Sequence, residues 1–184
     1  MILKKSMGML GSLCVVAALS GAASVAVAAD APAASTAVAA QKLALLDGKL
    51  SFTLQGYEKR EVPGGGPGTM YYNKDQKRVI IIGEDPIPMA ARGGTDADFL
   101  NGMKTIKEKQ QAASPDYKVV SEKTESVKGL NVHHIEATDN MDGNNVAQAT
   151  LLAAGNKKFT VIQVISNVKD PAGHAAAVNN ILGK

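Results

Sequence analysis

The chain has 184 residues and a formal net charge of +3, from 20 Lys and Arg against 17 Asp and Glu. Lys4 and Lys5 belong to the apolar N-terminus, so 18 basic residues (20 minus 2) face 17 acidic ones in the rest of the chain. Such a near-neutral domain is a poor candidate for nucleic-acid binding, for which a clear basic stripe is expected. There is no tryptophan, and the few tyrosines and phenylalanines argue against aromatic platforms that stack on sugars or bases.

A secretory signal is the first element that the sequence predicts. Residues 6–28 carry no charge and follow the short basic start. This stretch ends in an A-x-A motif, whose small residues Ala26 and Ala28 suit the pockets of signal peptidase. Residues 1–28 are therefore expected to be a signal peptide that is cut after Ala28. Cleavage leaves Ala29 as the first residue and places the protein in the periplasm, without a stable membrane anchor.

Two alternatives to a cleaved leader remain open. The uncharged run is long enough to span a bilayer as an inner-membrane anchor, although its second half is rich in Ala, Gly and Ser. Cys14 would be the modified residue of a lipoprotein, but bulky Leu13 precedes it where a small residue is needed. Because Cys14 is the one cysteine, the mature chain cannot form a disulfide.

The mature chain is expected to contain a flexible linker, residues 29–42, and one folded domain, residues 43–184. The linker is rich in Ala, Pro, Ser and Thr. In the domain, residues 50–54 alternate between apolar and polar and predict a half-buried strand. Residues 69–72 and 78–82 flank a polar turn and predict a hairpin. The β-branched run at 79–82 indicates a strand that is covered on both faces.

Two helices are expected later in the chain. The first begins at Thr95, an N-cap with Asp98 as partner in a capping box, and runs to just before Pro115. The second begins at Asp170 and Pro171, and its expected apolar stripe is Ala175, Val178, Ile181 and Leu182. Four strands are expected between them, at residues 118–127 near an edge, 130–138, 146–154 and 159–165, with an Asp-Gly hairpin joining the middle pair.

This order of elements predicts the α+β class, with an antiparallel β-sheet and two main helices packed on it. Several local strings resemble the DcrB family of bacterial envelope proteins, namely LLDGKLSF at 45–52, RVIIIGEDP at 78–86 and the Val119-Val120 pair. The resemblance covers about residues 43–182. It implies the fold that DcrB shares with the photosystem protein PsbP and the nuclear import factor Mog.

The resemblance also implies a role in the cell envelope, without an assigned biochemical activity or catalytic residues. Proteins of the DcrB type are typically lipoproteins that are anchored through a cysteine at the end of the leader. This chain has Ala26-Val27-Ala28 at that place and no suitable cysteine, which favours a soluble form.

No residue pattern predicts a metal, nucleotide or catalytic site. His133 and His134 are adjacent in a predicted strand and point to opposite faces, so one packed and one solvated histidine are expected. The segment around Asp142-Gly143 resembles a calcium loop, but Ala149 stands where the bidentate Glu is required. The Glu84-Asp85 pair before a proline is expected in a solvated turn. We therefore expect no cofactor and no enzymatic activity.

The first functional hypothesis is a non-enzymatic binding protein of the periplasm with another envelope protein, of unknown identity, as its partner. Two loops outside regular structure, at residues 63–68 and 85–94, are expected to contact it, since both are long and rich in glycine and proline. Their candidate residues are Gly64, Gly65 and Gly66 in the first loop, and Asp85, Pro86, Pro88 and Arg92 in the second. The alternative is a small-ligand or lipid-binding module, with an apolar pocket under the helix that begins near Thr95.

Cells that express the full-length chain should release a soluble periplasmic species that begins at Ala29, because the A-x-A motif directs cleavage after Ala28. Fractionation followed by intact-mass measurement checks this outcome. A membrane-bound species that keeps the leader, or a lipid-modified species that begins at Cys14, would contradict it.

Overall fold

The structure is a computed structural model, which describes residues 38–184. The predicted signal peptide and its cleavage residues Ala26, Ala28 and Ala29 lie outside these residues. No helix within the described range is long and apolar enough to cross a membrane. The elements are β1 (Gln41–Leu45), β2 (Leu50–Leu54), β3 (Glu58–Arg60), η1 (Pro63–Gly65), β4 (Thr69–Asn73), β5 (Arg78–Pro86), η2 (Met89–Ala91), α1 (Asp96–Met103), α2 (Ile106–Ala113), β6 (Lys118–Val127), β7 (Leu130–Met141), β8 (Asn144–Gly155), β9 (Lys158–Asn167) and α3 (Pro171–Leu182).

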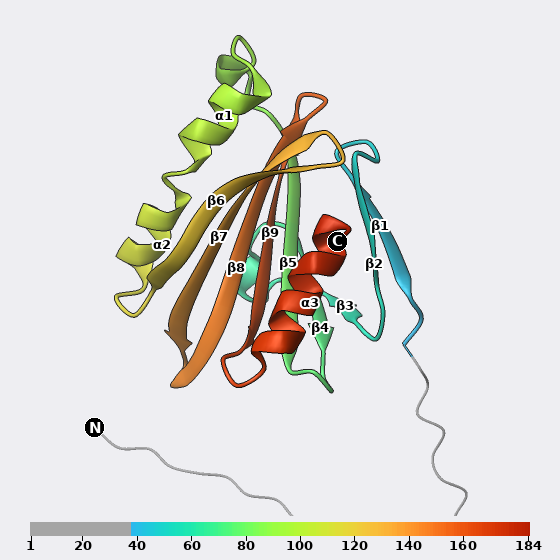
Figure 1. Cartoon of the computed structure of the whole chain (residues 1–184), viewed down its shortest axis with the longest axis vertical. Coiled ribbons are helices and arrows are strands. Elements are labelled where there is room, and N and C mark those ends of the chain that lie inside the picture. Colours follow the sequence, from blue (N-terminus) through green and yellow to red (C-terminus); the bar gives the residue numbers. More distant parts are fainter. Residues whose placement is uncertain (1–37) are drawn as a thin grey trace, which may run out of the picture. The chain divides into compact units, whose positions relative to one another are not determined.

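Seven strands form one antiparallel sheet in the order β3-β4-β5-β9-β8-β7-β6, while β1 and β2 pair as a separate hairpin (Figure 1). The longest strands, β7 and β8, are joined at Asp142-Gly143, where both φ angles are positive, 51° and 79°. This is the turn that an Asp-Gly pair favours. The structure therefore confirms the α+β class, the antiparallel sheet and the edge position of β6.

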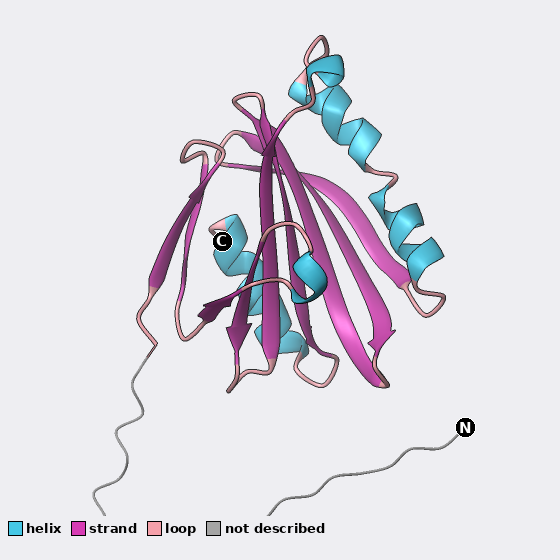
Figure 2. Cartoon of the chain, turned by 180° about the vertical axis from the view of Figure 1, so that it is seen from behind, coloured by secondary structure: helices cyan, strands magenta, loops and turns pink. Residues whose placement is uncertain are grey.

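The sheet separates two layers of helices. Successive side chains of a strand point to opposite faces. In β8, Leu151 packs in a cluster with α3 and the β1–β2 hairpin, whereas Leu152 packs in a second cluster with α1 and α2. The two helical layers thus lie on opposite faces. Figure 2 shows that α1 and α2 cover one side of their face and leave the central strands crossed only by the short η1 turn.

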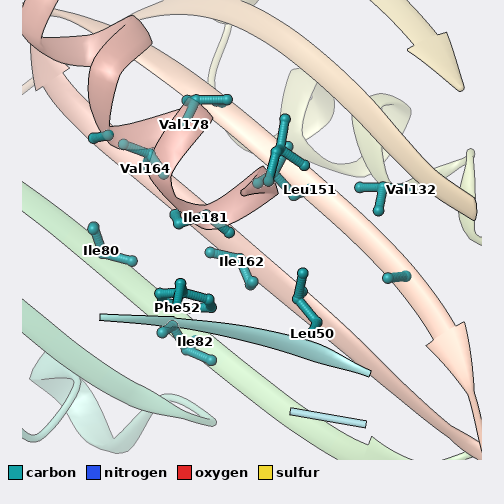
Figure 3. Close-up of a cluster of buried hydrophobic side chains, with 14 of the residues drawn as sticks. Leu50, Phe52, Ile80, Ile82, Val132, Leu151, Ile162, Val164, Val178 and Ile181 are labelled. Carbon is teal, nitrogen blue, oxygen red and sulfur yellow. The ribbon is translucent and has the colours of Figure 1, made fainter. Parts of the chain in front are cut away.

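The larger core lies between the sheet, α3 and β2. Figure 3 shows its apolar side chains converging from five strands and one helix: Leu50, Phe52, Ile80, Ile82, Val132, Leu151, Ile162, Val164, Val178 and Ile181. Full burial of a side chain of this size stabilises a fold by about 1.5–3 kcal/mol. This face of the sheet is therefore the main source of stability, and the opposite face is packed by a smaller cluster.

α3 begins as its sequence predicts, and three of the four residues expected in its apolar stripe, Val178, Ile181 and Leu182, are buried. The Asp170 carboxylate accepts a hydrogen bond from the Gly173 amide at 2.9 Å, and Gly183 closes the helix in the left-handed conformation. Ala175, which we expected in the apolar stripe, is exposed, and His174 and Ala177 are buried instead. His174 is buried because its ring faces polar groups on the sheet, Ser166 and Glu136.

The helix expected from Thr95 to Pro115 is broken into two. Its start is as predicted, since Thr95 and Asp98 form a complete capping box. Between α1 and α2 the chain turns at Lys104 and Thr105, and the Thr105 hydroxyl donates to the carbonyl oxygen of Gly102 at 3.2 Å. A threonine hydroxyl that bonds the backbone locally competes with the helix, and glycine is a weak helix former. The sequence carries both causes of the break.

Two short strands were not expected. β1 begins at Gln41, so its first two residues lie in the segment interpreted as linker, and β3 supplies three exposed residues to an edge of the sheet. The strand at 79–82 is also less covered than predicted. Ile80 and Ile82 are buried, but Val79 and Ile81 are half-buried because no helix lies over them.

β6, at the other edge, is interrupted by a bulge. Its register to β7 shifts between Val119 and Ser121, and Val120 is 68% exposed. The remaining residues of this strand are largely polar and exposed.

Gly68 offers a test of the packing at the start of β4. Its φ is +96°, and a Cβ added there would lie 2.5 Å from the carbonyl oxygen of Ile82. We expect Gly68→Ala to lower the free energy of unfolding by about 1–3 kcal/mol, because both the φ angle and the clash oppose a side chain. Urea unfolding measures the change. Gly93→Ala is the control, since nothing lies within 4 Å of its added Cβ, and an equal effect of both variants would contradict the prediction.

Candidate functional site

The two loops that the sequence singled out border the same hollow. Pro67, which follows η1, and Asp85, near the end of β5, are both among its lining residues. η1 crosses the uncovered part of the sheet in Figure 2. Segments that are separate in sequence therefore converge on the face that α1 and α2 leave open.

The glycines of the first loop shape it but do not line the hollow. Gly64 and Gly65 have φ angles of 75° and 71°, which favour glycine, and Gly66 is extended. Their place is in the short η1 turn and the residue after it. Pro67, the next residue along, is the residue of this loop that lines the hollow.

The second loop is shorter than predicted. Asp85 and Pro86 pair with β9 as the last residues of β5, so their assignment outside regular structure was wrong. A proline is tolerated at such a strand end. Pro88 precedes η2, and the Arg92 guanidinium donates from Nε to the carbonyl oxygen of Ile87 at 2.7 Å. Arg92 therefore closes its own loop.

The hollow is a groove on the sheet with a volume of about 360 Å³. We call it the β5–β9 groove, and it is lined by Ile81, Gly83 and Asp85 of β5, Phe159, Val161 and Gln163 of β9, Pro67, and Ile106 of α2. A volume of this size falls in the range of small-molecule sites, which is about 300–1,000 Å³. Most of the lining side chains are apolar.

Gly83 makes the floor of this groove open. It pairs with Val161 in the middle of the sheet, and a Cβ added to it would meet nothing within 4 Å. A glycine inside a strand lacks a side chain to pack and often marks a place where a ligand or another backbone approaches closely. The empty space above Gly83 is thus a consequence of the sequence.

A second hollow of about 440 Å³ lies beside α1, and we call it the α1 hollow. Its lining residues are Ala91, Asp98, Phe99, Gly102 and Met103. The ring centroids of Phe99 and Phe159 are 5.1 Å apart, and each ring lines one of the two hollows. The α1 hollow and the β5–β9 groove therefore lie on either side of one aromatic pair, close to the helix under which the sequence placed an apolar pocket.

Negative charge borders both hollows. Asp85 and Asp98 are their charged lining residues, and both are exposed. A hydrogen bond from the Thr95 hydroxyl lowers the pKa of the Asp98 carboxyl, which stays ionised at neutral pH. Neither hollow is lined by a lysine or an arginine. An anionic ligand would meet repulsion here.

A third hollow, of about 320 Å³, lies on the α3 face and includes Arg78 among its lining residues. The Arg78 guanidinium is buried and donates to Ser166 Oγ at 3.0 Å, to Gln76 Oε1 at 2.5 Å and to Asp170 Oδ2 at 2.8 Å. These bonds tie β5 to β9 and to the start of α3. Because its donors are engaged within the fold, we interpret Arg78 as structural.

The structure corrects the prediction of one packed and one solvated histidine. His133 and His134 do point to opposite faces, but both are buried, at 2% and 6% exposure. Each face has a helix over it at this level, which the sequence pattern did not show. No group of His, Cys, Asp and Glu in residues 38–184 is arranged to hold a metal ion.

A buried polar network joins α3 to the sheet. His134 Nε2 lies 2.6 Å from one oxygen of Glu136, and His174 Nε2 lies 3.0 Å from the other. The second nitrogen of His134 faces Glu125, and that of His174 faces Ser166. Burial alone raises the pKa of Glu136, but the bonds from the two histidines outweigh burial and lower this pKa from 4.5 to about 2. Glu136 is thus a carboxylate that secures the helix.

Comparison with solved structures identifies the fold. The solution structure of cyanobacterial PsbP (CyanoP) from Synechocystis sp. PCC 6803 is similar with a TM-score of 0.55 and 14% identity, over 78% of this chain and 89% of that one. The chain has a PsbP-like fold. No known sequence family matches it, and no curated protein does either.

Two further structures resemble the PsbP-like domain less closely. They are PA94 of Pseudomonas aeruginosa, a protein of unknown function, with a TM-score of 0.45, 13% identity and coverage of 76% of this chain and 91% of that one, and LpqN, involved in cell envelope biogenesis of Mycobacterium tuberculosis, with a TM-score of 0.47, 10% identity and coverage of 83% and 85%. Both similarities are too weak to carry a functional assignment.

Sequence reasoning missed most residues of the two hollows. Phe159, Val161 and Gln163 were read as one strand of the sheet, and nothing in that strand shows which face stays uncovered. Gly83 was the available signal, because it directly follows a run of β-branched residues and lies inside the same strand. His174 is distant in sequence from the two strand histidines, and α3 brings it to the sheet beside Glu136.

The Glu136 network predicts a pH-dependent stability. Its folded pKa is about 2 and its ordinary value is 4.5, so the stabilisation is complete above pH 4.5 and is lost as pH falls toward 2. We expect Glu136→Gln to unfold more easily than the parent at pH 6, by up to about 3 kcal/mol, with the difference shrinking between pH 4.5 and 2. Urea unfolding at several pH values measures it. Glu108→Gln, on the exposed side of α2, should leave the profile unchanged, and a constant difference across pH would contradict the prediction.

Proposed function

We propose that this chain is a non-enzymatic binding protein of the bacterial cell envelope, which binds through the β5–β9 groove and the adjoining α1 hollow. The observation that carries the proposal is the groove itself. It is an apolar recess over an open glycine, on a sheet face that the fold leaves half covered. Apolar surface of this kind is unfavourable in water unless something binds to it.

The chemistry of the lining supports binding over catalysis. Catalytic sites bring together polar groups with shifted pKa values in a cleft. The titratable residues that line the two hollows are Asp85 and Asp98, which belong to different hollows. The strongly shifted carboxyl, Glu136, lies on the other face of the sheet and is saturated by histidines. The residues that face the groove fit a role in recognition.

The envelope location rests on the predicted signal peptide and on the resemblance to the DcrB family. An exported domain with a PsbP-like fold and without a catalytic cluster in its clefts suits a module that meets a partner at the membrane surface or in the periplasm. The partner is either another envelope protein or a small apolar ligand, and the groove has dimensions that suit a protruding side chain, a peptide turn or an aliphatic chain.

Photo-crosslinking in cells tests the groove as the binding site. A benzophenone amino acid replaces Asp85 at the rim of the groove in the full-length chain, and in a matched variant it replaces Asp75. Both aspartates are exposed, but Asp75 lies in the β4–β5 turn, outside the hollows. We expect adducts after irradiation at position 85 and none at position 75.

A groove-filling variant sharpens the same experiment. Gly83→Val adds a side chain where nothing lies within 4 Å, at an ordinary strand φ, so the fold should keep its stability. The adducts at position 85 should fall at least fivefold in this variant. Gly93→Val, in an exposed loop that lines neither hollow, should leave them unchanged. Equal labelling at positions 85 and 75, or adducts that Gly83→Val does not reduce, would refute the groove as the site.

A further inference from the structure

Unpaired polar atoms are buried beneath α2, next to the β5–β9 groove. Four side-chain atoms in the described chain are buried without a hydrogen-bond partner: Gln110 Oε1, Tyr117 Oη, His133 Nε2 and Thr150 Oγ1. Tyr117 and Thr150 are 1% and 0% exposed. His133 Nε2 lies 3.0 Å from Glu122, but without the alignment of a hydrogen bond. Each buried polar atom without a partner costs about 1–3 kcal/mol, so their clustering calls for a functional reason.

These atoms share the sheet face of the groove. In the register of the sheet, Gln163 of the groove is paired across strands with Thr150, and Val161 of the groove is paired with Leu152, which is paired in turn with His133. Paired residues point to the same face. The unpaired polar atoms therefore lie next to the apolar floor of the groove, on the same face of the sheet and towards α2.

Tyr117 completes this polar end. Burial raises the pKa of its phenol, and the nearby carboxylates of Asp139 and Glu122 raise it further. The Thr150 hydroxyl is close enough to offset part of this rise in the pKa of Tyr117. Tyr117 Oη and Thr150 Oγ1 nevertheless lack the geometry of a hydrogen bond. Burial also lowers the pKa of His133, which is therefore neutral at pH 7. The polar end is thus built from uncharged donors and acceptors.

α2 is held loosely over these atoms. None of its residues is fully buried, and it is separated from α1 by the break at Lys104 and Thr105. Its side-chain ties to the sheet are the Lys107–Glu122 ion pair and, just past its end, the 2.6 Å bond from Ser114 to Asp139. Ile106 and Gln110 lie four residues apart, on one side of the helix, and contribute to the groove and to the polar cluster respectively.

We propose that the β5–β9 groove and the polar cluster beneath α2 form one site for an amphiphile, with a single aliphatic chain in the groove and an uncharged hydroxyl or amide head beneath α2. The head supplies hydrogen bonds to Thr150, Tyr117 and Gln110, and α2 shifts to admit it. This inference rests on the proposed function and names the class of ligand.

The charges around the site select the head group. Asp85 and Asp98 border the hollows, and no lysine or arginine lines them. Lys107 is engaged by Glu122. Lys104 lies close enough to lower the pKa of His133, but it is not among the residues that line the hollows. A carboxylate or phosphate head would be repelled by the two aspartates at the rim and would lose its hydration under α2. A cationic head would lose its hydration beside the neutral His133. An uncharged alcohol head loses the least hydration, and it supplies hydrogen bonds to Thr150, Tyr117 and Gln110, whose buried side-chain atoms lack partners.

Three probes with the same aliphatic chain and different head groups test the inference: 1-octanol, octanoate and octylamine at pH 7. Each is titrated into the protein purified from cells that express the full-length chain, and backbone amide NMR shifts report the affinity. We expect 1-octanol to bind at least tenfold more tightly than either charged probe, with shifts in β8, β9 and α2.

Three variants test where the aliphatic chain and the head group of 1-octanol bind. Thr150→Val removes an unpaired hydroxyl. It should therefore keep the stability of the protein and lower its affinity for 1-octanol at least fivefold. Thr160→Val is its matched control, because this buried hydroxyl already donates to the carbonyl oxygen of Gly83 at 2.7 Å, on the α3 side of the sheet, and its loss should leave the affinity unchanged. Gly83→Val should abolish the binding of 1-octanol.

The inference is overturned if 1-octanol does not bind, if octanoate binds as tightly, or if Thr150→Val leaves the affinity for 1-octanol intact. When 1-octanol fails but the benzophenone at position 85 still gives adducts that Gly83→Val suppresses, the groove serves a different ligand and the proposed function stands. When both experiments fail, the proposed function fails with the inference.

Discussion

Two faces of a seven-stranded sheet must be covered, and residues 38–184 supply three short α-helices to cover them. α3 has 12 residues, and α1 and α2 have eight each. One face is closed by α3 together with the β1–β2 hairpin, and the large apolar core forms there. The opposite face receives α1 and α2, which reach over one side of the sheet. The groove over β5 and β9 lies on the part of this face that the two helices do not cover.

Polar groups are buried on both faces of the sheet, but their hydrogen bonds are complete on one face and incomplete on the other. On the α3 face, Glu136 is bonded by two histidines, and each histidine has a second partner. A polar network that is fully satisfied fixes one geometry. On the α2 face, Tyr117 and Thr150 lack partners. The α3 face is therefore built for rigidity, and the α2 face keeps hydrogen-bonding capacity in reserve.

The sequence predicted the fold much better than the site. The Asp-Gly turn, the caps at Thr95 and Asp170 and the alternation along the strands depend on local chemistry, so their positions can be read from neighbouring residues. The pairing of Gln163 with Thr150, or the return of His174 to Glu136, depends on strands and a helix that meet across the fold. Which half of a face stays uncovered depends on where α1 and α2 pack on the sheet, and this position appears only in three dimensions.

The edges of the sheet decide how a partner can approach. A peptide joins a sheet by pairing its backbone with a flat, exposed edge strand. β3 has three residues, and β6 carries the bulge at Val120 among charged side chains. Such features blunt an edge and discourage the addition of another strand. The same bulge that disturbs the β6–β7 ladder thereby makes it harder for a second copy of the chain to pair along this edge, and it leaves the open face of the sheet as the more accessible surface.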